Sequence, residues 1–149
     1  MLDLTITDGK LGVREPVTKP HPGFFYEVGE ERFRKLVDDH YESIRTSSIA
    51  SLFPVNDVYS FEDAKKHAAD FFIEFCGGPD YFTQTRGEYK MVGRHSPFRI
   101  TDADRKEWLR LYQPLLQELL DEGIAQEYIQ SFWDYIEAHS KWMINTKES

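Results

Sequence analysis

Apolar residues recur at helical spacing throughout the periodic parts of this 149-residue chain. Over residues 30–46 the intervals are mostly three or four, which places one face of a helix against a core; the residues are Phe33, Leu36, Val37, Tyr41 and Ile44. Similar stripes predict helices over residues 61–76, 101–122 and 125–145. Because all the strongly periodic segments are helical, the predicted fold class is all-α, and the length suits one domain with its own core.

The first 22 residues have a different character. They contain Asp-Gly, Glu-Pro, Lys-Pro and His-Pro pairs, which exclude a long helix and predict an extended arm or a disordered extension. Leu2, Leu4 and Ile6 alternate with polar residues, which favours a short strand at the start of this segment.

Glycine and proline also divide the helical part of the chain. Gly77-Gly78-Pro79 should end the second helix, and residues 80–90 are expected to form a loop. Pro114 lacks a backbone donor and is expected to interrupt and bend the third helix. Gly123 suits the C-terminal cap of that helix.

The stretch from Gly93 to Trp108 carries the strongest candidate for a binding site. His95 precedes Ser-Pro, so a short helix carrying this histidine should stop there. Thr101 can cap the next helix, with Asp104 reaching back as in a capping box, and Trp108 follows on its second turn. A histidine on a last helical turn can bind a metal through a neutral ring nitrogen, although a lone histidine beside a proline is more often a surface or capping residue.

The composition indicates which kinds of ligand and partner the chain can bind. Aromatic residues make up 15% of the chain, with 11 Phe, 8 Tyr and 3 Trp, which suits the lining of a pocket for a flat ligand. The net charge of -8 argues against nucleic acid or an anionic membrane as the main partner. Basic residues nevertheless gather around His95, either as a solvated face or as a site for carboxylate or phosphate; they are Arg86, Lys90, Arg94, Arg99, Arg105, Lys106 and Arg110.

Cys76 is the one cysteine, so the chain cannot form an intrachain disulfide. A reducing compartment fits this composition, and the expected location is cytoplasmic. The sequence has no secretory signal pattern and no apolar stretch long enough to cross a membrane.

Several side chains on the predicted helix faces point to an interior space. Tyr41 lies on an apolar stripe, so its hydroxyl should face inward and needs a partner, either the backbone or a bound ligand. Ala64 and Ala68 leave room on the inner face of their helix for a neighbouring helix or for a ligand. His139 lies on the inner face of the last predicted helix and is interpreted as a histidine at the boundary of the core.

Taken together, these motifs resemble the truncated haemoglobins, and specifically their second group. The resemblance rests on Cys76–Pro79, on Arg94–Ile100, on Glu107–Leu109, on Tyr41 within Asp-His-Tyr, and on the closing Lys141–Asn145. It covers about residues 24–145. It divides the chain into an N-terminal extension, residues 1–23, and a truncated globin domain, residues 24–149.

The resemblance implies a two-over-two helical sandwich that holds haem b, iron protoporphyrin IX. His95 would be the iron ligand on the proximal side, with its other ring nitrogen donating to a backbone carbonyl of its own helix. Arg94 would pair with a haem propionate, and Tyr41 and Trp108 would donate hydrogen bonds to a bound ligand. The other residues placed around the haem by resemblance are Phe53, Ala64, His67, Ala68, Phe71 and Phe98.

Two departures from the family pattern concern the distal side. Many relatives have tyrosine or histidine where Phe53 stands, so one polar ligand contact is absent. The segment from Pro54 to Ala64 is longer than in typical members, so Tyr59 is a second candidate for entering the pocket. His67 is expected at the rim, facing a propionate or solvent, with direct iron binding as the alternative.

The function implied by the resemblance is binding of O2, and of the related small ligands NO and CO, at the haem iron. Oxygen transport, NO dioxygenase or peroxidase-like activity and an unidentified reductase as redox partner belong to the same expectation, with the chain a monomer or a weak homodimer. One alternative is a haem-free globin-like module that acts as a sensor or binds a partner. Another is a purely structural helical domain in which His95 caps a helix.

Overall fold

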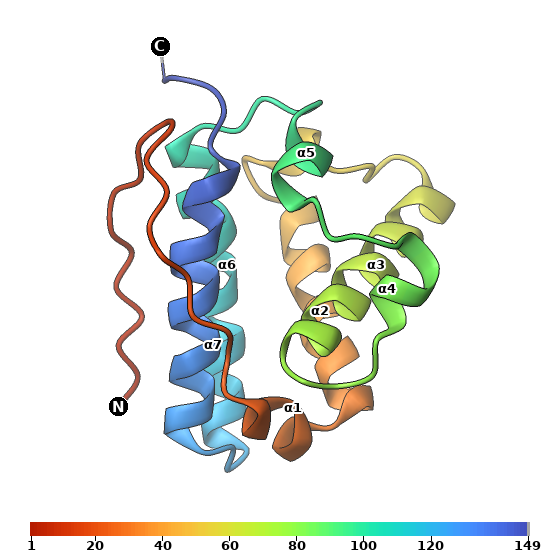
Figure 1. Cartoon of the computed structure of the whole chain (residues 1–149), viewed down its shortest axis with the longest axis vertical. Coiled ribbons are helices and arrows are strands. Elements are labelled where there is room, and N and C mark those ends of the chain that lie inside the picture. Colours follow the sequence, from red (N-terminus) through yellow and green to blue (C-terminus); the bar gives the residue numbers. More distant parts are fainter. Residues whose placement is uncertain (149) are drawn as a thin grey trace.

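Two pairs of long helices, α2 with α3 and α6 with α7, form the body of the molecule (Figure 1). The computed structural model describes residues 1–148. The helices in chain order are α1 (Pro22–Val28), α2 (Glu30–Arg45), α3 (Val58–Phe75), α4 (Tyr81–Arg86), α5 (Met91–His95), α6 (Asp102–Asp121) and α7 (Gln126–His139), with short 3-10 helices η1 (Ala50–Leu52) and η2 (Ser140–Met143). The predicted all-α class and the two-over-two arrangement are confirmed within the described residues.

The core lies between the two helix pairs and is rich in aromatic rings. Phe24 of α1 stacks on Phe132 of α7 with ring centroids 4.9 Å apart, and Phe33 of α2 meets the edge of the same ring at 5.9 Å. These three side chains are fully buried. Burial of such large apolar surfaces is the main source of stability here, since each phenyl ring contributes roughly 1.5–3 kcal/mol.

The helix boundaries differ from the predictions at three places. Helix α4 lies inside the segment expected to be a loop, because Phe82 buries its ring against Phe71 and draws one helical turn onto α3. Helix α6 continues through Pro114 and is not interrupted there. Helix α7 ends at His139, and the chain continues as a tighter 3-10 turn instead of reaching residue 145.

The predicted start and end of α6 are confirmed. Thr101 Oγ1 accepts from the amide of Asp104, and a carboxylate oxygen of Asp104 accepts from the amide of Thr101, so the capping box is complete. Gly123 follows the last turn with φ of 99°, a left-handed conformation that favours glycine, and its amide donates to the Leu120 carbonyl.

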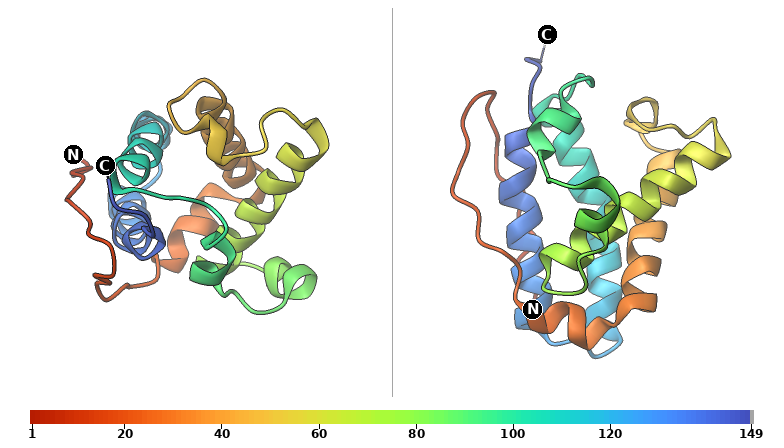
Figure 2. Two further views of the ribbon diagram at one scale, coloured as in Figure 1. Left: turned by 90° about the horizontal axis from the view of Figure 1, so that it is seen from above. Right: turned by 45° about the vertical axis from the view of Figure 1, so that its right-hand side comes forward.

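The N-terminal arm is extended and lies along α7 (Figures 1 and 2). No strand forms in residues 1–21, so the expected short strand is wrong: the backbone pairs with helix side chains and not with another strand. Gln130 donates to the carbonyl of Asp3 and accepts from its amide, while Glu137 accepts from the amide of Thr7. The apolar side chains at positions 2, 4 and 6 pack against the core. Their alternation therefore reflects an extended backbone with one side toward the core, although no strand forms.

Helix α1 begins within the predicted N-terminal extension and carries two buried phenylalanines, Phe24 and Phe25. The division of the chain at residue 23 stays a prediction. Among the described residues, none of the helices combines the length and the apolar character needed to cross a membrane.

Candidate functional site

A cavity of about 380 Å³ lies between the two helix pairs and is lined mainly by apolar and aromatic side chains. This volume falls in the range typical of small-molecule sites in proteins. The structure brings together all the residues predicted to form the site, since each of them lines this cavity: Tyr41, Phe53, Ala64, His67, Ala68, Phe71, Arg94, His95, Phe98 and Trp108.

His95 is the last residue of α5 and presents its ring to the cavity. Its Nδ1 lies 2.6 Å from the carbonyl oxygen of Met91, four residues earlier, so Nδ1 carries the proton and donates. That leaves the Nε2 lone pair available as a metal ligand. Within residues 1–148 no three His, Cys, Asp or Glu side chains cluster to hold a metal, so a metal at His95 would take its other ligands from a non-protein group.

Tyr41 and Trp108 supply polar groups to an otherwise apolar wall. Burial raises the pKa of Tyr41 to about 12, so its hydroxyl keeps its proton at neutral pH and remains a donor. In the described part of the chain, neither this hydroxyl nor the Trp108 indole N–H has a hydrogen-bond partner. Phe53 meets the Tyr41 ring edge-on with centroids 5.5 Å apart and adds no polar group.

His40, behind this wall, is a residue that the sequence reasoning did not select. It is fully buried, and its Nε2 lies 2.9 Å from the Trp108 carbonyl oxygen. Its ring stacks on Tyr112 with centroids 3.6 Å apart. Burial lowers the pKa of His40 to about 3, against a smaller opposing effect of the bond to the carbonyl, so the ring is neutral and Nε2 donates. His40 therefore ties α2 to α6 directly beside both Tyr41 and Trp108.

Helix α3 contributes Ala64 and, one turn later, His67 and Ala68 to the cavity. His67 is half-buried, and its pKa is lowered first by burial and then by the positive charges of Arg86 and Lys66. A neutral imidazole at this position can donate or accept toward the cavity. Tyr59 does not enter the pocket, because α3 already starts at Val58 and turns this side chain outward, where 85% of it is exposed.

Five of the seven basic residues fall into two sets. Arg86, Arg94 and Arg105 line the cavity, whereas Lys106 pairs with Asp8 and Asp102, and Arg110 pairs with Glu107. Arg105 is buried and is held by Glu137 and Asp102. The gathering of positive charge around His95 is thus partly a set of ion pairs in the protein itself.

Arg94 is anchored to the backbone that precedes α5. Its Nε donates to the carbonyl of Tyr89 at 2.6 Å, and one Nη donates to the carbonyls of Arg86 and Glu88 at 3.0 and 2.8 Å. The guanidinium also lies over the Phe82 ring, 5.1 Å from its centroid. In this arrangement Arg94 fixes the connection between α4 and α5, and the predicted pairing with a propionate stays a prediction.

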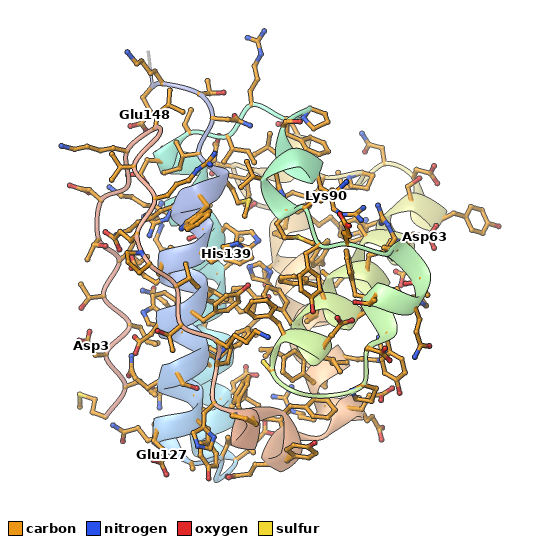
Figure 3. The ribbon with its side chains drawn as sticks, viewed as in Figure 1. Asp3, Asp63, Lys90, Glu127, His139 and Glu148 are labelled. Carbon is orange, nitrogen blue, oxygen red and sulfur yellow. The ribbon has the colours of Figure 1, made fainter. Side chains whose placement is uncertain are left out.

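His139 has more than the core role expected for it, and it lines the cavity together with Tyr135. Figure 3 shows it on the inward side of α7, toward the part of the molecule that holds α5. Its Nδ1 is 2.9 Å from the Tyr135 hydroxyl oxygen. Burial lowers the pKa of His139 to about 4. The spacing of four residues on a helix was the available sequence signal for this pair.

The fold and the cavity together define a class of protein. Two crossed helix pairs enclose an apolar space of about 380 Å³, and one histidine offers a ring nitrogen to it from the end of a short helix. This is the arrangement of a globin of the two-over-two type.

Comparison with known proteins gives the same class and narrows it. The sequence profile of the Bacterial-like globin family matches residues 24–145. The chain belongs to this family, in its second group of truncated haemoglobins. Members of the family hold a haem and bind small gas ligands such as O2.

Three similarities support the placement. The chain is 30% identical over 122 residues to the group 2 truncated hemoglobin YjbI of Bacillus subtilis (strain 168), covering 82% of this chain and 88% of the relative. It matches the crystal structure of phosphate-bound Hell's gate globin IV with a TM-score of 0.85 and 35% identity, over 97% of this chain and 89% of that one. The truncated oxygen-avid haemoglobin from Bacillus subtilis matches with a TM-score of 0.70 and 26% identity, over 82% and 98%.

Proposed function

We propose that this protein binds haem b in the cavity through His95 and uses it to bind O2 and the related ligands NO and CO. The observation that carries the proposal is the hydrogen bond from His95 Nδ1 to the Met91 carbonyl, which leaves Nε2 as the one free imidazole nitrogen at the end of α5. Haem iron supplies a coordination position at which a diatomic ligand binds and exchanges electrons.

The lining of the cavity fits the porphyrin. Phe71, Phe82 and Met91 offer apolar surface to a flat macrocycle, and Phe98, 46% exposed, lies at the mouth. Arg86 is the basic group best placed for a propionate, because the donors of Arg94 are largely taken up by backbone carbonyls. His67 would lie at the rim, near the same carboxylates.

Two donors would act on the bound ligand. Tyr41 and Trp108 both line a mainly apolar cavity, where a hydrogen bond from the hydroxyl or the indole N–H to a partly charged oxygen is stronger than in water. His40 would keep both in register, since it neighbours Tyr41 in sequence and donates to the Trp108 carbonyl. The same donors would assist NO dioxygenation or a peroxidase-like reaction, with an unidentified reductase supplying electrons.

The remaining expectations for the chain stay with this proposal. A cytoplasmic protein that is a monomer or a weak homodimer suits the single buried Cys76 and the net charge of -8. Oxygen transport is one use of such a protein. A haem-free sensor or interaction module is the outcome expected if the purified chain takes up no haem.

An absorption spectrum after supplementation with haem tests the proposal. The wild-type protein should show a strong Soret band, and His95→Ala should lose haem or hold it loosely. His67→Ala is the matched control, because it removes another cavity histidine and should retain haem. A ferrous spectrum that is unchanged in His95→Ala would contradict the assignment. A low-spin spectrum that becomes high-spin in His67→Ala would instead show that His67 binds the iron.

A further inference from the structure

Tyr135 is a buried phenol at the cavity wall with a single acceptor for its proton. Its side chain is 1% exposed, and its hydroxyl oxygen lies 2.9 Å from His139 Nδ1. Within residues 1–148 the phenol has no other acceptor, so its O–H donates to Nδ1 and the imidazole proton resides on Nε2. Phe75 stacks on the tyrosine ring, with centroids 4.8 Å apart.

This arrangement suits one chemical task in particular. A phenol gives up an electron readily only when its proton leaves at the same time, and a base within hydrogen-bond reach can take that proton. Nδ1 of His139 is such a base, held in place because the two residues are one helical turn apart on α7. Phe75 and the buried surroundings keep water from the ring, which would protect a radical once formed.

The pair also lies on the route between the cavity and the surface. Both Tyr135 and His139 line the same cavity as His95. The rings of Tyr135 and His139 are 5.3 Å apart, and those of His139 and Trp142 are 6.1 Å apart. Trp142 is half-exposed beneath the N-terminal arm, where its indole N–H donates to the carbonyl of Glu15 at 2.8 Å. The aromatic rings of Tyr135, His139 and Trp142 therefore form a sequence of neighbours from the cavity to the surface.

We propose that Tyr135 is an internal electron donor to haem that has been oxidised by hydrogen peroxide, that His139 accepts its proton, and that Trp142 is the surface end of this chain. The inference rests on the proposed function. Peroxide takes two electrons from the haem and, with two protons from solvent, becomes two molecules of water. Tyr135 restores these electrons one at a time, in two rounds, and in each round it passes its proton to Nδ1 of His139. A one-electron donor such as ascorbate then returns an electron to the tyrosyl oxygen through Trp142, and the proton returns from Nδ1.

Electron paramagnetic resonance after rapid freezing of ferric holoprotein mixed with hydrogen peroxide tests the proposal. Wild type should give a protein radical whose signal narrows when ring-deuterated tyrosine is incorporated. Tyr135→Phe keeps the ring and its stacking on Phe75 but lacks the hydroxyl, and should lose this signal. Tyr128→Phe is the matched control, because Tyr128 also stacks on a histidine, His21, at 4.5 Å and does not line the cavity. A signal that persists in Tyr135→Phe would overturn the proposal.

Two further variants test the proton acceptor and the surface end. In His139→Gln the amide can still accept a hydrogen bond but is not a base, so the radical should form about a hundredfold more slowly. In Trp142→Phe the radical should form normally, and its reduction by ascorbate should be slower. Unchanged formation in His139→Gln would overturn the role of His139, and unchanged reduction in Trp142→Phe would overturn that of Trp142.

The two proposals fail in different ways. A colourless protein after haem supplementation would overturn haem binding, and the electron-donor role would fall with it. A red protein whose Soret band responds to peroxide, but whose radical is insensitive to position 135, would overturn the electron-donor role alone.

Discussion

Tyr41 and Trp108 are chemically alike in one respect: each has a polar hydrogen and no protein acceptor for it among residues 1–148. Phe53 adds no polar group to the cavity, so these two residues are the candidates to interact with a ligand. A donor that already has a partner must break a bond before it can serve a ligand, whereas these two need not. Polar stabilisation of bound O2 should therefore be sensitive to each of them.

Tyr41→Phe and Trp108→Phe should each release O2 about ten to a hundred times faster than wild type, because a hydrogen bond to a charged group is worth roughly 1.5–3 kcal/mol. CO is less polar when bound and should respond much less. Stopped-flow and flash-photolysis rates measure both. Equal shifts for O2 and CO, or no shift for O2, would mean that these side chains only fill space.

His40 should make stability depend on pH. Its pKa is about 3 in the folded protein and about 6.5 when the chain is unfolded, so the unfolded state binds the extra proton as the pH falls. The contribution of neutral His40 to the free energy of unfolding is therefore fully present above pH 6.5. Below that pH it is lost progressively, and the free energy of unfolding is lower by about 2 kcal/mol at pH 5.

Urea unfolding at pH 7 and pH 5 measures this effect. In His40→Gln the amide can still donate to the Trp108 carbonyl but does not titrate. Between pH 7 and pH 5 the free energy of unfolding of this variant should therefore fall by about 2 kcal/mol less than that of wild type. The same pH dependence in both proteins would show that His40 titrates normally in the folded state.

The sequence was informative about single residues where a local rule fixed their position. The helix carrying His95 ends before Ser96-Pro97 as predicted, although Ser96 itself keeps a helical backbone conformation. The capping box starts α6 ahead of Trp108, so this boundary could be predicted as well. The spacing of four residues places Tyr135 and His139 on one face of α7, but whether they bond to each other also depends on how the tyrosine side chain is rotated as it stacks on Phe75. No spacing rule gives that rotation.

At the scale of elements, α5 is a short helix that is held from both sides. Five residues form too few internal hydrogen bonds to be stable alone, so other parts of the chain must fix it. On its N-terminal side, the side chain of Arg94, within α5, donates to the carbonyls of residues 86, 88 and 89. After it, Asn145 donates to the carbonyls of His95 and Phe98 at 3.3 and 2.8 Å. The position of His95 thus depends on these two side chains.

Arg94→Met should therefore loosen α5 and speed haem loss by about tenfold or more, since each charge-assisted hydrogen bond is worth roughly 1.5–3 kcal/mol. The measurement is haem transfer to an acceptor protein, made with ordinary haem and with haem dimethyl ester. The difference between variant and wild type should persist with the ester, because Arg94 acts through the backbone. A difference that vanishes with the ester would show that Arg94 pairs with a propionate.

Helix order and most helix limits follow from apolar periodicity, because burial of one face decides where a helix lies. The exceptions have tertiary causes. Helix α4 forms because Phe82 finds a place against Phe71, and the extended arm forms no strand because α7 supplies amide side chains in place of a neighbouring strand. Neither partner is near in sequence, so neither outcome could be predicted from local pattern.

At the scale of the whole molecule, the arm runs along α7 in both directions. Met1 and Asp3 bind Gln126 and Gln130, Glu15 binds Lys141 further on, and on the return the amide of His21 donates to Ser131. The buried Arg105 joins the arm to both α6 and α7, because it donates to the Thr7 carbonyl as well as to Glu137. The arm is therefore part of the folded unit, although most of its residues are exposed.

Gln130→Ala removes both hydrogen bonds to the backbone of Asp3. The amide of Asp3 should exchange its hydrogen roughly fivefold to tenfold faster, because one such bond is worth about 1 kcal/mol. Gln117→Ala on α6 is the matched control, since that amide pairs with Asp121 and does not touch the arm. Equal exchange in the two variants would mean that the arm is held by its apolar side chains alone.

The attachment of the arm has a consequence for how gas reaches the interior. From Met1 to Glu15, its hydrogen bonds to the helices run to α6, α7 and η2. The molecule is thus stiffened along one half. Within residues 1–148 the arm also meets the C-terminal end of α3, where Lys19 lies over the Phe75 ring, but it makes no hydrogen bond to the connection between α2 and α3. Transient local openings should then concentrate in the half without the arm. The motions that admit a diatomic molecule should therefore involve residues 46–57 and not the half that carries the arm.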